Sequence, residues 1–227
     1  WLKGAQMAAK PPPPWIRAGC KPLLLGLGHE SRLAYPAYRN ALGRMFVEYV
    51  REYHHKQGAT TPWTRMSHLA ADYAQPHGMM LLRLWDVQSH SDTAFRLRVF
   101  LAEQEISTDR LVVVHEDKGV AFSDVKAVPA SQNNNADIKV LKKLLGTDKF
   151  ATLQLGIGVN SGTRHVLTRP VDWETQQVSE GDTEELLNVV FPALTEWMIK
   201  TSVGGAVLTE GRTWKKKQFG RGHRPWE

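Results

Sequence analysis

Short apolar runs alternate along the chain with segments whose apolar residues recur at helical spacing. The run at residues 111–114, Leu-Val-Val-Val, is continuous and rich in β-branched residues, which is typical of a strand covered on both faces of a sheet. Strands are predicted over residues 23–25, 79–85, 111–114 and 152–159, and helices over residues 41–53, 91–106, 136–145 and 184–201. This alternation predicts an α/β domain with a largely parallel sheet and helices on both of its faces.

Capping and breaking residues support these boundaries. Gly26 and Gly28 close the first apolar run, as expected of a buried strand that ends in a tight loop. Ser91 or Asp92 can cap the second helix, and Gly146 is the expected C-cap of the third. A proline in the last predicted helix, at position 192, is expected to kink it.

The chain divides by composition into a central domain and two terminal extensions. Residues 1–21 contain four consecutive prolines, which cannot donate backbone hydrogen bonds and predict an extended arm. Residues 22–203 hold the predicted strands and helices, and residues 204–227 form a basic tail. A chain of 227 residues is therefore expected to be one domain with an arm and a tail.

The tail holds much of the positive charge. The chain has 29 Lys and Arg against 23 Asp and Glu, a formal net charge of +6 that favours a polyanionic partner. In the tail, cations alternate with aromatic residues and glycines, a composition suited to phosphate contacts and to stacking on bases. A solvated tail without a ligand is the alternative. Contact with RNA is predicted for Arg212, Lys215, Lys216, Lys217, Arg221 and Arg224.

Several other functional classes find little support. The single cysteine, Cys20, cannot form an internal disulfide, as expected in a reducing compartment, and no apolar run approaches the roughly 20 residues of a membrane span. The loop at residues 26–28 lacks the third glycine of a dinucleotide-binding motif, with Ser31 in its place. His54 and His55, adjacent on a predicted helix, point in different directions and are not expected to bind a metal. Neither a metal nor a small-molecule cofactor is predicted.

Three segments resemble, in order and at suitable separations, the bacterial-type peptidyl-tRNA hydrolase family. Residues 24–28, LLGLG, are similar to the family's GLGNPG loop, and residues 106–116, ISTDRLVVVHE, resemble its strand IPPEELLVVHD. The strongest match is residues 138–158, IKVLKKLLGTDKFATLQLGIG, which resemble LKSIIEHLGTxxFxRLRIGIG. The resemblance covers roughly residues 22–200. It implies a single domain with a twisted, mixed and mostly parallel sheet flanked by helices, and a cleft at the strand ends where the family binds the tRNA acceptor stem and the peptide.

The resemblance also implies which residues stand at the family's catalytic positions. The family cleaves the ester between peptide and tRNA with a histidine that activates water, an acid that orients this histidine, and asparagines that place the substrate and stabilise charge. The asparagine of the GLGN loop corresponds to His29. The histidine corresponds to Arg39, or to Asn40 if one residue has been inserted. Neither can act as the base, because arginine stays protonated and a carboxamide has no basic nitrogen.

The remaining catalytic positions also differ from the family. Glu116 stands for the orienting aspartate, Ser91 for the asparagine of the MNLSG element, and Ala136 for the asparagine of the GGHNG loop. We therefore expect the catalytic residues to be lost and the protein to be a pseudo-enzyme. The alternative is a divergent hydrolase in which His29 or His115 serves as a relocated base near Glu116.

A fold kept without its chemistry indicates selection for shape and RNA affinity. The expected function is that of a non-catalytic RNA-binding protein, a structural or assembly component of a mitochondrial ribosome, with ribosomal RNA and neighbouring ribosomal or assembly proteins as partners. Arg164 and Arg169, in the segment that corresponds to the family's substrate-side cover, are predicted to contact this RNA. The start at Trp1 rather than Met favours a processed, imported protein of the mitochondrial matrix, with plastid or cytoplasm as alternatives. An organellar intron-splicing factor is the other binding function considered, since an altered member of the resembled family works in that way.

Overall fold

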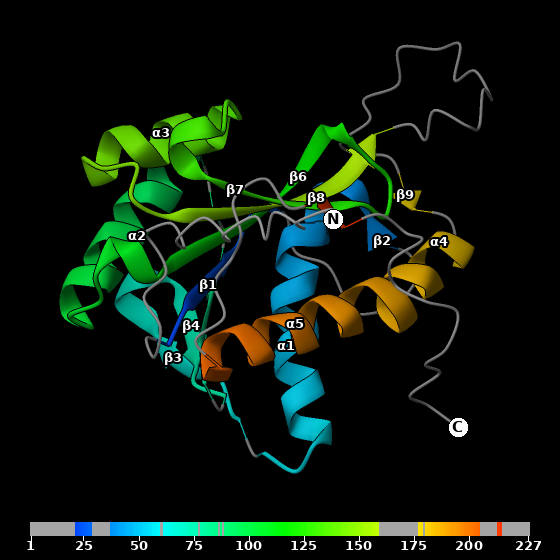
Figure 1. Cartoon of the computed structure of the whole chain (residues 1–227). Coiled ribbons are helices and arrows are strands. Elements are labelled where there is room, and N and C mark those ends of the chain that lie inside the picture. The colour runs from blue at the N-terminus through cyan, green and yellow to red at the C-terminus, as the bar shows by residue number, and fades with distance from the viewer. Residues whose placement is uncertain are drawn as a thin grey trace, which may run out of the picture.

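The computed structural model describes residues 21–28, 37–59, 61–76, 78–85, 87, 89–158, 177–178, 180–204 and 213–214. At its centre lies an eight-stranded sheet with the strand order β10-β7-β8-β6-β1-β5-β4-β3 (Figure 1). Its strands are β1 (Leu23–Gly26), β3 (Thr64–Met66), β4 (Ala71–Ala74), β5 (Met80–Leu84), β6 (Leu111–Ala121), β7 (Val125–Pro129), β8 (Ala151–Gly158) and β10 (Thr213–Trp214). A separate two-stranded sheet pairs β2 (Ala37–Tyr38) with β9 (Gln177–Val178).

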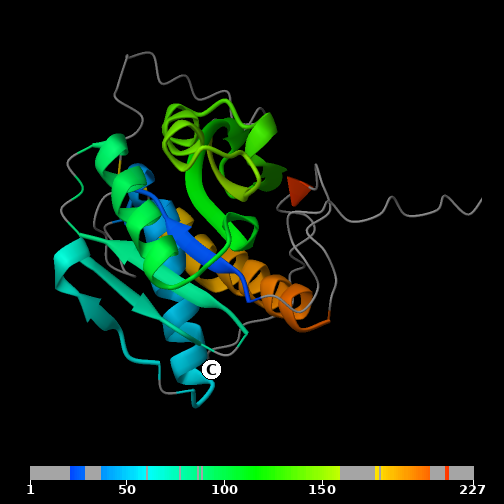
Figure 2. The ribbon, with the colours of Figure 1, turned by 90° about the vertical axis from the view of Figure 1, so that its left-hand side faces the viewer.

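Helices cover both faces of the large sheet (Figures 1 and 2). On one face lie α2 (His90–Glu103) and α3 (Ala136–Leu145), which pack against each other. On the other face lie α1 (Leu42–Lys56) and α5 (Phe191–Gly204), with the short α4 (Glu180–Glu185) preceding α5. The predicted α/β fold is therefore confirmed.

The sheet is mixed, and its parallel part is confined to the centre. Strand β1 pairs in parallel with β5 and β6, and β6 pairs in parallel with β8. The pairings toward both edges, which involve β3, β4, β7 and β10, are antiparallel. Because parallel strands need helical crossovers, the central strands are the ones that both helical layers cover.

Strand β1 shows why the central sequence is apolar at every position. Leu24 packs into the core under α1 and α5, whereas Leu23 and Leu25 pack into the core under α2 and α3. All three side chains are fully buried. Successive residues of a strand face opposite sides, so a strand covered twice has no solvent-facing position.

The observed boundaries differ from the predicted ones in a few places. Ser89, rather than Ser91 or Asp92, caps α2, because its Oγ accepts the backbone N–H of Asp92 at 3.1 Å. Strand β6 does not end at residues 115–117 but continues to Ala121. The sequence pattern also missed β3, β4 and β7, the short strands that pair in antiparallel fashion outside the parallel centre.

The last predicted helix is interrupted, as Pro192 led us to expect. A π-helical turn, Leu186–Val190, separates α4 from α5. The carbonyl of Asn188, four residues before the proline, lies within this turn. A proline ring clashes with the carbonyl four residues earlier, and the wider π turn relieves this clash.

Little of the two extensions falls within the described residues. Residues 1–20 of the arm lie outside them, as does the tail apart from Gly204, the last residue of α5, and β10, which pairs in antiparallel fashion with β7. The tail is thus joined to the sheet at Thr213 and Trp214. Within the described part of the chain, none of the helices combines the length and the apolar character that crossing a bilayer requires.

Candidate functional site

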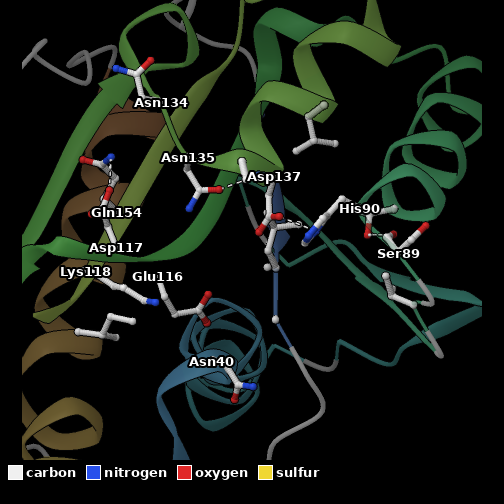
Figure 3. Close-up of a pocket in the computed structure, with 18 of the residues that line it drawn as sticks. Asn40, Ser89, His90, Glu116, Asp117, Lys118, Asn134, Asn135, Asp137 and Gln154 are labelled. Atoms are coloured by element: carbon white, nitrogen blue, oxygen red, sulfur yellow. Dashed lines mark hydrogen bonds and ion pairs between the residues drawn. The ribbon is translucent and has the colours of Figure 1, made fainter. Parts of the chain in front are cut away.

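A pocket of about 930 Å³ opens where the parallel strands end (Figure 3). Its walls come from the C-terminal ends of β1 and β5, the second half of β6, the start of α2 and the start of α3. Such a crevice at the carboxyl ends of parallel strands is the usual ligand position in an open α/β sheet. The polar residues that line it are Asn40, Ser89, His90, Thr93, Glu116, Asp117, Lys118, Gln132, Asn134, Asn135, Asp137 and Gln154.

Glu116 is the acid that the sequence placed at this site, and it does line the pocket. Its Oε1 accepts a hydrogen bond of 3.0 Å from the backbone N–H of Gly43, in the first turn of α1. Burial raises the pKa of Glu116 to about 7, although backbone N–H groups that include Gly43 favour the ionised form. The side chain can therefore exist in either protonation state near neutral pH.

Close backbone packing holds Asn40 and Glu116 beside the loop after β1. Gly28 has a φ of +112°, and a Cβ there would lie 2.4 Å from the Asn40 carbonyl oxygen and 3.0 Å from Glu116 Oε1. Only glycine fits this position, which explains the glycine of the LLGLG segment without any role in nucleotide binding. Asn40, one of the two residues at the position of the family's base, therefore lies at the pocket beside the acid.

His115, considered as a relocated base, does not face the pocket. Its side chain is only 1% exposed, and it is not among the described residues that line the pocket. Nδ1 lies 2.8 Å from the carbonyl oxygen of Glu116, and Nε2 lies 2.8 Å from Nδ2 of Asn133. Burial lowers its pKa, against the raising effects of the Glu116 carbonyl, Asp117 and Asp137. Because both ring nitrogens are engaged inside the protein, the hypothesis that His115 is the base is wrong.

Carboxamide groups form a large part of the pocket wall. Ala136, which stands at the position of a family asparagine, lines the pocket as the first residue of α3, and the preceding residue, Asn135, lines it as well. The Oδ1 of Asn135 caps α3 by accepting the N–H of Asp137 at 2.8 Å, and its Nδ2 points into the pocket (Figure 3). Asn134 and Gln154 also line the pocket, where Gln154 donates to Asp117 at 2.7 Å.

An imidazole and a carboxylate that the sequence analysis did not select also meet in the pocket. His90 Nδ1 lies 2.5 Å from Asp137 Oδ1, and the two side chains are 65% and 30% exposed. They join the first turns of α2 and α3 and face the same space as Glu116 and Asn135 (Figure 3). No sequence signal pairs them, since the contact exists only because the two helices start side by side.

The other predicted residues divide into three groups. Ser91 is exposed in the first turn of α2 and is not among the described residues that line the pocket, which Ser89 and His90 line instead. For Arg39, the structure describes the backbone alone. His29 and the predicted RNA contacts lie outside the described residues, namely Arg164, Arg169, Arg212, Lys215, Lys216, Lys217, Arg221 and Arg224.

The charges of the described residues that line the pocket do not favour a phosphate group. Among them are three carboxylates, Glu116, Asp117 and Asp137, together with Lys118 and His90. Across the described ranges, no three side chains of His, Cys, Asp or Glu lie close enough together to hold a metal ion. The arrangement can position a ligand through amide donors and acceptors, and Glu116, with its raised pKa, can exchange protons near neutral pH.

Comparison of the chain with known proteins identifies a family that it matches. Residues 23–205 match the family model described as peptidyl-tRNA hydrolase. A peptidyl-tRNA hydrolase of Bifidobacterium adolescentis is 30% identical over 73 residues, which are 32% of this chain and 37% of that protein, so the match spans well under half of the relative's length.

Solved structures agree on the fold. The structure of a peptidyl-tRNA hydrolase from Acinetobacter baumannii has a TM-score of 0.60 at 13% identity and covers 84% of this chain and 92% of that one. A peptidyl-tRNA hydrolase in complex with N-propanol has a TM-score of 0.59 at 13% identity, with the same coverage. With a matching family model over most of its length and this shared fold, the chain belongs to the peptidyl-tRNA hydrolase family.

Proposed function

We propose that this chain is a non-catalytic, RNA-binding member of its family, and that it serves as a structural or assembly component of a mitochondrial ribosome. The observation that carries the proposal is the pairing of Glu116 with the backbone N–H of Gly43 next to Asn40. The acid that would orient a basic histidine in the family is bonded here to the start of α1.

The loss of the base has a predictable chemical cost. Asn40 cannot accept a proton from water, because its amide nitrogen is not basic. General-base catalysis contributes about 100-fold to 10,000-fold to the rate of a hydrolysis of this kind. Glu116, with a pKa of about 7, does not orient an imidazole here, because the hydrogen bonds that its carboxylate makes among the described residues come from backbone N–H groups.

The distribution of charge supports an RNA ligand that is held mainly outside the pocket. The carboxylates of the pocket repel phosphates, whereas the tail, joined to the sheet through β10, carries six cations between residues 212 and 224. Phosphate neutralisation by such a segment gives binding that weakens as the salt concentration rises. We therefore assign the phosphate contacts to the tail and to Arg164 and Arg169.

The catalytic part of the proposal is tested with labelled peptidyl-tRNA. We expect the full chain to bind the RNA without releasing peptide above the rate without protein, while a known active peptidyl-tRNA hydrolase serves as the positive control. Release of peptide at a rate that scales with protein concentration would overturn the proposal.

The setting is tested separately, in the source organism. A tagged chain is expected to sediment with a mitochondrial ribosomal subunit or its precursors and to recover ribosomal RNA. Recovery of intron-containing organellar transcripts would instead favour the splicing function. Sedimentation as a free protein would contradict both settings.

The His90–Asp137 pair favours a second candidate function, a divergent hydrolase. A carboxylate that contacts one imidazole nitrogen orients the ring and leaves the other nitrogen to accept a proton from water. In that case the peptide release seen with the wild type would disappear in His90→Gln and fall strongly in Asp137→Asn. Ser91→Ala, in the same helix turn and exposed, is the matched control, and His29→Ala tests the remaining histidine of the sequence hypothesis.

A further inference from the structure

The loop that carries Asn134 and Asn135 rests on a buried hydrogen-bond network. His115, Asn133 and Thr152 are 1%, 1% and 0% exposed. Nδ2 of Asn133 lies 2.8 Å from Nε2 of His115 and 2.9 Å from Oγ1 of Thr152. These side chains come from β6, from the loop before α3 and from β8, so the network joins two central strands to the pocket wall.

Backbone groups at the ends of the network fix the direction of its hydrogen bonds. The N–H of Asn135 donates to Oδ1 of Asn133 at 2.9 Å, so this atom is the oxygen of the carboxamide. The hydroxyl of Thr152 donates to the carbonyl of Val128 at 3.0 Å, so its oxygen accepts from Asn133. A flipped carboxamide would place two donors against each other at Asn135.

The same reasoning fixes the charge of His115. Its Nε2 must accept the hydrogen bond from Asn133, and its Nδ1 carries the proton that it donates to the carbonyl of Glu116. The ring is therefore a neutral Nδ1–H tautomer. Asp117 and Asp137 favour the charged ring, but burial outweighs them and lowers the pKa.

A second anchor holds the loop from the side of α3. Nζ of Lys142 donates to the carbonyl oxygens of Ala130 and Asn133, each at 3.1 Å. The backbone before Asn134 is thus held in the free protein both by the buried network and by Lys142 of α3. Groups fixed in advance lose little conformational freedom on binding, and so retain more of their interaction energy.

We propose that His115 and Asn133 are positioning residues that set the amides of Asn134 and Asn135 to read the bases of single-stranded RNA. The inference rests on the proposed RNA-binding function and adds the part of the RNA that the pocket takes. Amide groups in a pocket lined by three carboxylates suit uncharged acceptors and donors, such as base carbonyls and ring nitrogens, rather than phosphates.

The network is tested by NMR on the full chain with ¹⁵N-labelled histidine. We expect His115 to show the neutral Nδ1–H tautomer and to resist protonation below the usual pKa of histidine. In Asn133→Asp, a carboxylate oxygen faces Nε2, so the ring should become an imidazolium with a raised pKa. An Nε2–H tautomer in the wild type, or the same titration in both proteins, would overturn the assignment.

The reading of bases is tested with two fluorescent RNAs of equal length and equal phosphate number, one with normal bases and one abasic. Asn133→Ala and Asn135→Ala should bind the normal RNA about 3- to 10-fold more weakly than the wild type, the effect of losing one or two hydrogen bonds. Binding of the abasic RNA should not change. Asn188→Ala, an exposed asparagine in the π-helical turn on the opposite face of the sheet, is the matched control.

The outcomes separate the two proposals. If the wild type binds neither RNA, the proposed function fails together with this inference. If it binds both RNAs equally well, or if the variants lose affinity for both to the same degree, only the reading of bases is refuted. Thermal melting checks that the variants fold, and Asn135→Ala, whose side chain lies outside the buried network, carries the test if Asn133→Ala does not fold.

Discussion

The Oε1 atom of Glu116 accepts the backbone N–H of Gly43 across 3.0 Å, although the two residues are 73 positions apart in the chain. This contact ties the middle of β6 to the first turn of α1. The helix start provides unpaired N–H groups and a favourable dipole for the carboxylate, while burial works against its charge. The position of the acid therefore depends on how closely α1 approaches the sheet.

Gly43→Ala is predicted to destabilise the protein by about 2 kcal/mol or more. A Cβ at this position would lie 2.4 Å from the carbonyl oxygen of Val114 and 2.7 Å from that of Leu27, so α1 would have to move away from the sheet. Urea unfolding measures the change. Gly181→Ala is the control, since a Cβ there meets nothing within 4 Å in α4, and its stability should stay equal or rise by up to about 1 kcal/mol. Equal effects of the two substitutions would contradict the close packing.

Glu116→Gln is predicted to change the pH dependence of stability. The pKa of Glu116 is raised from 4.5 to about 7 in the folded state, so its contribution to stability is complete below pH 4.5 and is lost as the pH rises through 7. The glutamine variant keeps an acceptor for Gly43 without this loss. Its free energy of unfolding should therefore exceed that of the wild type by an amount that grows between pH 5 and pH 8, up to about 3 kcal/mol.

The same series of pH values provides its own control. The lowered pKa of His115 acts in the opposite direction, because this histidine favours unfolding as the pH falls below its usual value near 6.5. Both proteins contain His115, so this effect cancels in the comparison. Parallel stability curves for the wild type and Glu116→Gln would show that Glu116 titrates normally.

Arg83→Met is predicted to destabilise the sheet edge by about 3–5 kcal/mol. The guanidinium lies 4.3 Å and 4.4 Å from the ring centroids of Trp63 and Trp85, donates to Asp72 at 2.8 Å and 3.0 Å, and also pairs with Glu48. Its removal leaves two largely buried carboxylates without this partner. Chemical unfolding measures the effect.

Two further variants test the origin of that loss. Arg83→Lys keeps the charge but not the planar fork that stacks and bonds at the same time, so it should recover only part of the stability. Arg98→Met, on the exposed side of α2, should change the free energy of unfolding by less than about 0.5 kcal/mol. Full recovery by lysine would show that charge alone matters.

Removal of residues 212–227 is predicted to weaken RNA binding and to reduce its dependence on salt. The segment carries Arg212, Lys215, Lys216, Lys217, Arg221 and Arg224, and each phosphate contact that is lost lowers the slope of log K against log salt by about 0.7 to 0.9. The deletion also removes β10, so a variant with the six cations changed to glutamine provides the control for loss of the strand. An unchanged affinity and slope in both proteins would refute the role of the tail.

The sequence by itself determined the elements whose signals are local. The apolar run at residues 23–25 and the β-branched run at 111–114 gave central strands, because a strand buried on both faces has no polar position. The third helix was predicted at residues 136–145 and found there, since Asn135 caps its start and Gly146, with a φ of +68°, ends it. The short antiparallel strands β3, β4 and β7 were missed because their pairing partners, rather than their own composition, make them strands.

Only the tertiary structure decided which polar residues share the pocket. His115 and Glu116 are neighbours on one strand, yet one faces the interior and the other the pocket, because successive side chains point to opposite sides. His90 meets Asp137 in the pocket because α2 and α3 begin next to each other at the ends of the sheet. The sequence shows which residue types are present. The distances between their side chains and the directions in which these point follow from the packing of the helices, which no local pattern encodes.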